Sequence, residues 1–534
     1  MNTAIAHPET AGVSTLVRFT MRRERRILPW WLLGTAVLMA LQSVSSQNFY
    51  DTPAKLAQLR ATMEANAAIV AMGGPTRLLE TVGGEVVFEI FAYLAIVVSL
   101  MNMFLIGRNT RSDEETGRAE LVRSAPVGRR SIIVAALVVA LVVDAVVAVV
   151  VAGTAVVTGL PVAGSVLVGM SVAGIGFTVA AATAVVAQVF ENPRSVYGAV
   201  TALIAVMYVA RAIGDTGTDA VAWVSPIGWG QRTFPYVDDR WWPLALFAAV
   251  SAVLIATAFW LSRRRDFGAG LFGYRIGRAT ASPLLGSPVG LTWRLQRGAV
   301  LGWALGAAVL GGAYGSFADS IEQFLADNPE LAAYLGGDVH DAVDSYLAFT
   351  LSISALLAAA CGVAGILRAR SEEARGLSEL ILSAPVGRVR WLTGYVAVAL
   401  VGSAVVLVAG GFGEGLAHGL RVDEPLQALR LAVSALAYLP AVWVVVAVAA
   451  AFVGWAPEIS AVLGWTYYGY VVVALLFIDA FDLPGWFAGA SPLRHTALVP
   501  LQRPDALASG ILLAVTVVLT GVAWAGIRRR DIGR

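Results

Sequence analysis

The sequence predicts an all-α polytopic membrane protein with about 12 transmembrane helices, arranged as two homologous six-helix halves in parallel repeat. Three observations predict this class. Hydrophobic residues occupy 58% of the 534 positions and charged residues only 14%, whereas soluble domains carry about 25% charged residues. Apolar runs long enough to cross a bilayer, which takes about 20 residues, recur along the chain. A polar segment of the first half also recurs in the second half.

Apolar runs bounded by Arg, Pro and Gly define the expected spans in chain order. In the first half they cover 27–46, 85–107, 131–158, 162–190, 195–213 and 242–262. In the second half they cover 298–318, 344–367, 391–415, 425–453, 458–480 and 507–527. We therefore expect a first half over 1–266, a cytoplasmic linker over 267–290 and a second half over 291–534.

The distribution of basic residues predicts the orientation of these spans. If the N-terminus is cytoplasmic, the segments on the inner side hold 28 of the 38 Lys and Arg residues. This bias agrees with the positive-inside rule and predicts that both termini are cytoplasmic. A cleaved signal peptide is an alternative for the first span, because four arginines precede it. A similar sequence in the middle of the chain, at 292–310, argues against cleavage.

The internal repeat is clearest in a polar segment. Residues 111–129 and 370–388 are identical at 12 of 19 positions. Resemblance among apolar helices cannot explain this identity, because these residues are polar. We expect each segment to form a short helix that ends before Pro126 or Pro385, since the residue before proline disfavours helix. The alternative is that each segment is a solvated cytoplasmic turn without a binding role, as most charged runs are.

Several classes of function find no support in the sequence. Lys55 is the single lysine and does not lie in a G-x-x-x-x-G-K-[ST] motif, so the chain itself has no P-loop for ATP hydrolysis. The histidines lack the spacing of a zinc protease, and nothing indicates an enzyme, a metal site or nucleic-acid binding. Cys361 is the one cysteine and excludes a disulfide within the chain.

The motifs together resemble a known family. The E-x-x-G-x-x-E-L motif at 114–121, the arginine-rich lead-in at 16–26 and Ser-Pro-Ile-Gly-Trp at 225–229 resemble the ABC-2-type permeases of actinobacterial polyketide-antibiotic exporters, of the tetronasin type. The resemblance implies an ABC exporter transmembrane domain in a bacterial plasma membrane. It also implies that two copies of a separate ABC ATPase, which would bind ATP and Mg²⁺, associate with this chain, and that the chain itself holds no cofactor.

The resemblance also assigns residues to roles. It implies that 112–124 and 371–383 are coupling helices that contact the ATPases. The matching residues are Glu114, Gly117, Glu120 and Leu121 in the first half, and Glu373, Gly376, Glu379 and Leu380 in the second. The lead-ins to the first span of each half resemble connecting helices on the inner leaflet, with Arg22 and Arg25 in one and Arg294 and Arg297 in the other.

Polar groups within the spans are candidates for the substrate pathway. A charge near the bilayer centre costs about 2.5–3.5 kcal/mol on insertion scales, and Asp144 lies deepest. It could contact a substrate or cation, or be a buried carboxyl that bonds to a neighbouring helix. The aromatic run Trp465, Tyr467, Tyr468 and Tyr470 could line a cavity for an apolar compound or pack against other helices. Other ionisable residues near span ends, including Arg211 and Glu414, are expected to reach the membrane interface.

Three functions remain open from the sequence. The first is the permease of an ATP-driven exporter of hydrophobic or amphipathic compounds, including drugs, with lipid molecules as an alternative cargo. The second is a proton-coupled transporter that depends on Asp144, since secondary transporters also have two parallel halves. The third is a membrane enzyme or scaffold that transports nothing.

Overall fold

The computed structural model describes residues 9–531 except 51, 65–66, 267, 272–279, 328–338 and 477–484. All regular elements in these described ranges are helices. The chain divides into two compact units, Met1–Gly277 and Arg278–Arg534, which we call unit 1 and unit 2. The division falls within the segment expected to be a linker, 267–290. Each unit has its own hydrophobic core.

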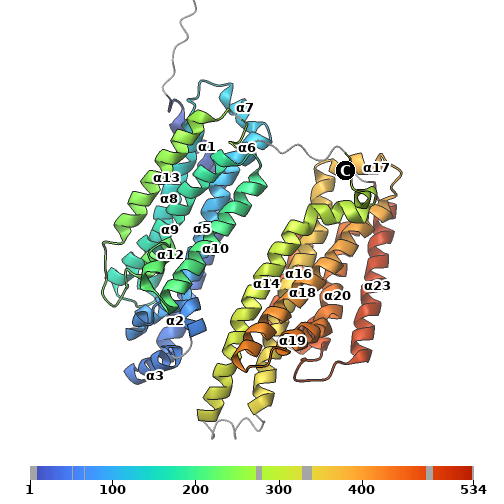
Figure 1. Ribbon diagram of the computed structural model, residues 1–534. Helices are drawn as coiled ribbons and strands as arrows, with labels where there is room; N and C mark the ends of the chain where they lie inside the picture. Colours follow the sequence, from blue (N-terminus) through green and yellow to red (C-terminus); the bar gives the residue numbers. More distant parts are fainter. Residues whose placement is uncertain are drawn as a thin grey trace, which may run out of the picture. The chain divides into compact units, whose positions relative to one another are not determined.

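Helix α5 (Val82–Asn109) is the centre of unit 1 and packs against α2, α8, α9 and α10. Figure 1 shows α7 at one end of this unit and α3 at the other, and we name the two ends after these helices. The remaining helices are α1 (Val13–Glu24), α2 (Leu28–Phe49), α3 (Pro53–Glu64), α4 (Ala67–Gly73), η1 (Thr76–Glu80), α6 (Arg111–Glu115), α7 (Arg118–Arg123), α8 (Ser131–Val157), α9 (Val162–Val189), α10 (Pro193–Thr216), α11 (Asp219–Ala222), α12 (Pro226–Gln231) and α13 (Leu244–Arg264).

Helix α16 (Val339–Ala374) has the corresponding central place in unit 2 and packs against α14, α18, α20 and α21. The end of the unit that carries α17 is called the α17 end. The other helices are η2 (Pro283–Gly286), α14 (Pro288–Asp327), α17 (Leu377–Leu382), α18 (Arg388–Arg421), α19 (Gln427–Ala435), η3 (Leu436–Tyr438), α20 (Leu439–Trp455), α21 (Ser460–Leu476), α22 (Gly485–Gly489), η4 (Pro492–His495) and α23 (Ala506–Arg529).

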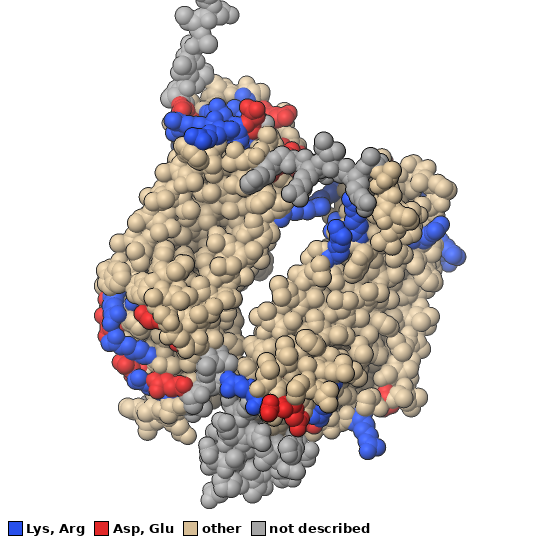
Figure 2. Space-filling model, in the orientation of Figure 1, with Lys and Arg blue, Asp and Glu red and all other residues tan. Residues whose placement is uncertain are grey.

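Eleven helices in the described ranges are long and apolar enough to span a membrane, six in unit 1 and five in unit 2. The number expected from the sequence was about 12. The difference is α21, whose described part has 17 residues and covers about 25 Å at 1.5 Å per residue, less than a hydrocarbon core of about 30 Å. The rest of the expected span 458–480 lies outside the described residues after Leu476. In Figure 2, a broad band of uncharged side chains separates the charged ends of each unit.

Local sequence explains where several of these helices begin. The side chain of Thr81 accepts a hydrogen bond from the Gly84 amide at the start of α5. Asn192 caps α10, and Pro193 occupies its first position, where a missing N–H costs nothing. Asp505 accepts hydrogen bonds from two amides at the start of α23. Such caps satisfy backbone donors that have no partner within the helix.

The two expected coupling helices differ from their predicted form. The helix expected over 112–124 is broken into α6 and α7 at Gly117, and the one expected over 371–383 is the end of α16 followed by α17. Gly117 and Gly376 both have a φ of 72°. This left-handed conformation ends a helix and favours glycine, which has no Cβ to clash with the carbonyl oxygen.

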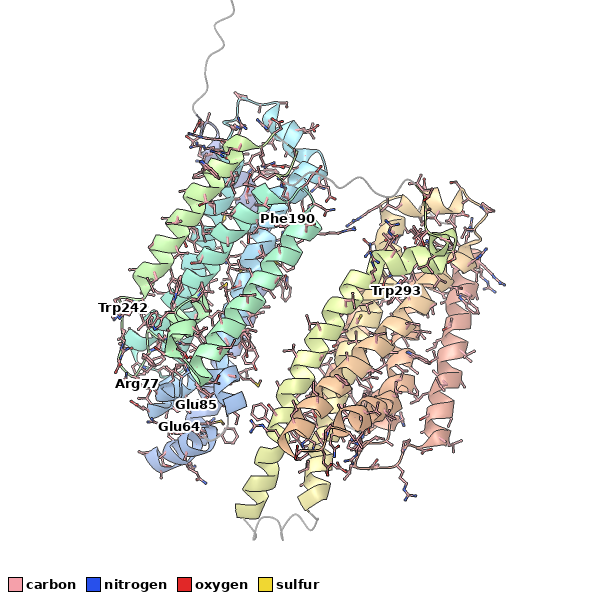
Figure 3. All side chains as sticks on the ribbon, viewed as in Figure 1. Glu64, Arg77, Glu85, Phe190, Trp242 and Trp293 are labelled. Atoms are coloured by element: carbon pink, nitrogen blue, oxygen red, sulfur yellow. The ribbon has the colours of Figure 1, made fainter. Side chains whose placement is uncertain are left out.

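The two lead-ins also differ from each other. In unit 1, α1 is a separate helix before α2, and its role as a connecting helix stays a prediction. In unit 2, residues 292–297 belong to the long helix α14, which continues into the span without a break. Figure 3 shows the part of α14 around Trp293 lying across the end of unit 2. The two lead-ins also differ in sequence, because the lead-in of unit 2 lacks the four closely spaced arginines of 22–26.

Close approach of α14 to α18 depends on two glycines. A Cβ at Gly311 would lie 2.2 Å from the Gly410 carbonyl oxygen, and one at Gly315 would lie 2.0 Å from the Glu414 carbonyl oxygen. Both distances are shorter than van der Waals contact. A Cβ at Gly306, one turn and a half earlier on α14, would meet no atom within 4 Å. Gly311 and Gly315 therefore form the packing surface, and Gly306 does not.

We predict that Gly311→Val separates α14 from α18 and lowers the stability of unit 2 by about 1–3 kcal/mol, the usual cost of overpacking. Thermal unfolding of the purified protein in detergent measures this effect as a lower Tm. Gly306→Val is the matched control, because it adds the same side chain to the same helix in open space. Equal melting temperatures for the two variants would contradict the packing argument.

Candidate functional site

The candidate site begins with residues 111–129 of unit 1 and 370–388 of unit 2, which we call the matching segments. In each, an inward-facing part precedes the left-handed glycine and a short helix of 6 residues, α7 or α17, follows it. The N–H of Glu120 bonds to the Gly117 carbonyl and that of Glu379 to the Gly376 carbonyl, both at 3.2 Å. The two segments therefore share a backbone conformation as well as residues.

Glu114 and Glu373, which occupy the same place in the two matching segments, point into the protein. Glu114 accepts hydrogen bonds from Arg265, with Nη2–Oε1 at 2.8 Å and Nη1–Oε2 at 3.0 Å. Glu373 accepts from both Nη atoms of Arg530, with Nη2–Oε2 at 2.8 Å. Arg265 and Arg530 each directly follow the last spanning helix of their unit, α13 or α23. The carboxylates of Glu114 and Glu373 thus have partners within the chain, and their predicted contact with an ATPase stays a prediction.

The neighbouring acids tie the matching segments to the lead-ins. In unit 1, Arg23 of α1 donates to Asp113 at 2.6 Å. In unit 2, Arg368 donates to Glu372 at 2.9 Å and to the Leu295 carbonyl of α14 at 2.9 Å. Glu372 also accepts a hydrogen bond from the hydroxyl of the buried Tyr395. Each segment is therefore bonded both to its lead-in and to the chain that follows its last span.

The short helices present a different set of side chains to the surface. Leu121 on α7 is 76% exposed, and Leu380 at the matching place on α17 is 75% exposed. Glu120 and Glu379 beside them are also exposed, whereas Ala119 and Ser378 face inward and are buried. Both units consequently present an acidic and a leucine side chain on a short helix. We call these four residues the Glu-Leu faces.

The four arginines expected on the connecting helices lie at the surface of their units. Arg22, Arg25, Arg294 and Arg297 are all exposed. Sequence reasoning did not single out Arg23, which makes the ion pair with Asp113 described above. Its neighbour Glu24 makes a second link to the end of α5, because its buried carboxylate accepts from Arg108 at 2.7 Å and from Asn109 at 2.9 Å.

A cavity of about 260 Å³ lies beside the matching segment of unit 1. Its wall includes the charged side chains of Glu114, Arg123, Arg129, Arg265 and Asp266. Arg129 also donates to the carbonyl oxygens of Ser262 and Arg265 at 3.2 Å and 3.0 Å. A wall with so many charges suits water or a polar group rather than an apolar compound.

Asp144 is buried within unit 1, with 2% of its surface exposed. Its Oδ1 accepts a hydrogen bond from Asn102 Nδ2 at 2.8 Å, and the same amide nitrogen donates to the Val98 carbonyl at 3.1 Å. Gly176 leaves room for this pair, because a Cβ there would lie 2.6 Å from Asp144 Oδ1. The residue therefore has a partner on α5, and its role in a substrate pathway stays a prediction.

The aromatic run of α21 makes ring contacts within itself and with α22, and its three tyrosines also pack against the hydrophobic core of unit 2. The rings of Trp465 and Tyr468 meet edge to face with centroids 5.7 Å apart. The Tyr470 hydroxyl donates to the Phe487 carbonyl at 2.5 Å, and the Tyr467 and Tyr470 rings lie 5.9 Å apart. These contacts are those expected of helix packing, and lining of a substrate cavity by these residues stays a prediction.

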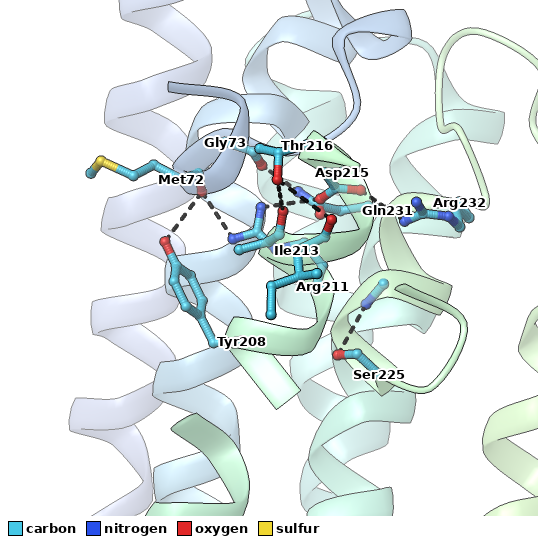
Figure 4. Close-up of polar contacts among 12 residues, drawn as sticks. Met72, Gly73, Tyr208, Arg211, Ile213, Asp215, Thr216, Ser225, Gln231 and Arg232 are labelled. Atoms are coloured by element: carbon cyan, nitrogen blue, oxygen red, sulfur yellow. Dashed lines mark hydrogen bonds and ion pairs between the residues drawn. The ribbon is translucent and has the colours of Figure 1, made fainter. Parts of the chain in front are cut away.

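Arg211 and Glu414, which were expected to extend toward the membrane interface, are instead fully buried within their units. Arg211 donates to the Met72 carbonyl at 3.1 Å and lies 3.5 Å from Asp215. Figure 4 shows this cluster, in which Arg232 approaches Asp215 from the other side at 3.0 Å. Glu414 accepts from the Thr350 hydroxyl at 2.5 Å. Ionic and polar partners within each unit replace water for these side chains.

Electrostatics at the edge of this cluster follow from Arg232. Its guanidinium also donates to Asp219, with Nη2–Oδ1 at 2.5 Å, and this hydrogen bond lowers the pKa of the Asp219 carboxyl below its ordinary value. Figure 3 places Arg77 and Glu85 at the same α3 end of unit 1. Arg77 pairs with Asp238 at 2.8 Å. This end of the unit is therefore held together by several ion pairs.

We predict that Asn102→Leu destabilises the protein by about 1–3 kcal/mol, because it leaves the buried Asp144 carboxyl without its hydrogen-bond partner. The double variant Asn102→Leu with Asp144→Leu should lose less stability than the single variant, since no buried polar group is then left unpaired. Thermal unfolding of the three proteins measures both effects. Additive losses in the double variant would contradict the pairing.

The long apolar helices and the two polar ends define this chain as a multi-pass membrane protein. Comparison with known proteins then identifies its family. The sequence model of the family described as "Multidrug efflux system permease Rv1217c, C-terminal domain" matches residues 14–263 and 285–528. The multidrug efflux system permease protein Rv1217c of Mycobacterium tuberculosis (strain ATCC 25618 / H37Rv) is 33% identical over 526 residues, which cover 98% of this chain and 95% of that protein.

The chain belongs to this family of membrane permeases. Both matched ranges include one matching segment, so the family model covers Glu114 and Gly117 as well as Glu373 and Gly376. The relative extends along nearly the whole of both units. Membership of a permease family favours a transporter over a membrane enzyme or scaffold.

Proposed function

We propose that this chain is the permease subunit of an ATP-driven ABC exporter that moves hydrophobic or amphipathic compounds out of a bacterial cell. Two copies of a separate ATPase subunit would bind ATP and Mg²⁺, and both termini of the chain would be cytoplasmic. The proposal rests on the permease family, on the absence of a P-loop from the sequence and on the resemblance to ABC-2-type permeases of polyketide-antibiotic exporters, of the tetronasin type.

The observation that carries the proposal is the pair of Glu-Leu faces. An exposed leucine without apolar neighbours is common, but the same residue pair at the same place in both units, with leucines 76% and 75% exposed, favours two equivalent contacts. Two copies of one ATPase would meet that requirement. The six-residue helices and the left-handed glycines before them give each face the same local shape. The resemblance assigns the coupling role to these same residues.

The transported compound would be apolar. The relative is a multidrug efflux permease by name, and the resemblance suggests polyketide antibiotics. Lipid molecules share the same chemistry and are the alternative cargo. In the proposed cycle, ATP binding closes the ATPase pair, displaces the Glu-Leu faces and changes the affinity of the permease for its cargo, because a cycle can do work only if affinity differs between states.

We predict that Glu120→Arg combined with Glu379→Arg abolishes export while the protein remains in the membrane. Both side chains are exposed, so the changes leave the packing of the units intact, and they reverse the charge that each face offers to its partner. Efflux of an apolar fluorescent dye from cells, together with the amount of permease in the membrane, measures the result. Glu115→Arg is a matched control, because it reverses an exposed acid on the same segment outside the Glu-Leu face. Unchanged efflux in the double variant would refute the role of these faces.

A second prediction concerns the partner. Gentle purification of this chain from native membranes should recover a P-loop ATPase at two copies per permease. Mass spectrometry identifies the bound chain, and its mass in the intact complex gives the number of copies. A chain that exports its cargo without any ATPase would contradict the proposal.

A proton-coupled transporter is the alternative function, and the buried Asp144 favours it. In that case Asp144→Asn would uncouple export from the proton gradient, because it removes the carboxyl but leaves a side chain that can still bond to Asn102. Export by the unaltered protein would stop when the proton gradient is collapsed, even at high ATP. Export that persists without a proton gradient would exclude this mechanism, and export that stops when ATP is depleted would favour the ABC exporter.

A further inference from the structure

Two adjacent acids in each matching segment bond to two different arginines of the same unit. The first acid, Asp113 or Glu372, bonds to an arginine that contacts or belongs to the lead-in. The second acid, Glu114 or Glu373, bonds to the arginine that directly follows the last spanning helix. Asp113 and Glu114 together are called the twin acids of unit 1, and Glu372 and Glu373 those of unit 2.

Burial makes the second of these contacts strong. The side chains of Glu114 and Arg265 are 9% and 8% exposed, and Glu373 is fully buried. Water screens such pairs little, and loss of one partner leaves a buried charge without compensation. Arg111 adds a third charged group in unit 1 at 2.7 Å from Glu114, and Arg530 also donates to the Val453 carbonyl at 3.3 Å. The contact is therefore built into both units.

The two units reach the same arrangement with different residues. In unit 1, Arg23 of the lead-in supplies the positive charge for the first acid. The residue at the corresponding place in unit 2 is Leu295, and Arg368 of α16 supplies the charge instead while its Nη1 donates to the Leu295 carbonyl. A link between lead-in and matching segment is kept although its donor has moved to another helix. Because the two units form this link with different arginines, similarity of sequence between the halves does not explain it, and a functional requirement for the link is favoured.

The last helix of each unit packs mainly against one neighbour, α13 against α9 and α23 against α20, and is otherwise exposed. Only 17% of the apolar stretch of α13 and 22% of that of α23 is buried inside the protein, against 72% for the central helix of unit 1. In both units, the ion pair between the second acid and the arginine after the helix joins the end of this helix to the matching segment. Arg129 and Arg388 of the matching segments strengthen this junction, because they donate to the carbonyl oxygens of Arg265 and Arg530.

We propose that the twin acids connect each Glu-Leu face to the lead-in and the last helix of its unit, so that a displacement of the face moves these helices with it. Glu114 and Glu373 are positioning residues in this mechanism. The inference rests on the proposed function, since an ATPase must displace the faces. It adds to that function the path by which the displacement enters each unit. The path ends on α13 in unit 1 and on α23 in unit 2.

The test measures movement of α23 in the complete complex with its ATPase. Spin labels on cysteines introduced at Leu507 of α23 and Leu429 of α19, which are 75% and 62% exposed, report their distance within unit 2. The native Cys361 is buried and does not compete for the label. We expect ATP with vanadate to change this distance in the unaltered complex. Glu373→Gln should abolish the change while the ATPase stays bound and hydrolyses ATP within about twofold of the original rate.

Four variants separate transmission from simple stability. Glu115→Gln, on an exposed acid of the matching segment in unit 1, should leave the distance change intact. Arg530→Glu should abolish it, and Arg530→Glu combined with Glu373→Arg should restore it, because the ion pair is then rebuilt with reversed charges. Arg530→Lys keeps one charged contact and should retain part of the change.

The outcomes have distinct meanings. A distance change that persists in Glu373→Gln would overturn the inference, as would an unaltered complex in which ATP changes no distance. Loss of bound ATPase or of protein abundance in Glu373→Gln, without rescue by the charge reversal, would show a structural role only and would also overturn it. If no ATPase is recovered with the unaltered chain, the proposed function fails first, and this inference fails with it.

Discussion

The cost of removing polar groups from water governs the structure of this protein at every level. A backbone that crosses a bilayer must satisfy its hydrogen bonds internally, and the described spans are accordingly helices. The same cost applies to side chains. Asp144 lies beside the Asn102 amide, Arg211 beside Asp215, and Glu414 beside the Thr350 hydroxyl. Polar side chains buried in an apolar surrounding are therefore found where a hydrogen-bond or ion-pair partner replaces water.

At the α7 and α17 ends, this constraint separates two kinds of acidic residue. Glu114 and Glu373 are enclosed by arginines and belong to the framework of their units. Glu120 and Glu379 lie six residues further along the chain, beyond a left-handed glycine, and are exposed. The left-handed backbone at Gly117 and Gly376 therefore divides one motif into a part that holds the unit together and a part that is exposed at the surface.

Sequence reasoning located most helices because apolar runs and their arginine, proline and glycine boundaries are local properties. It located the matching segments because polar identity repeated at a distance cannot arise from composition. It did not find the ion pairs of Glu114 with Arg265 or of Arg23 with Asp113, since these residues are 151 and 90 positions apart. It also placed Arg211 and Glu414 at the membrane interface, because burial by neighbouring helices is not visible in a single span.

The sequence by itself determined the membrane class, the approximate spans and the repeated polar segment, because hydrophobicity and residue identity act locally. It also contained the C-terminal arginines of both halves, in RRRDFG and RRRDIG, without indicating what they bond. Only the tertiary structure decided which acids face inward and which glycines of α14 touch α18. These properties depend on contacts between residues that are distant in the chain, and folding alone brings such residues together.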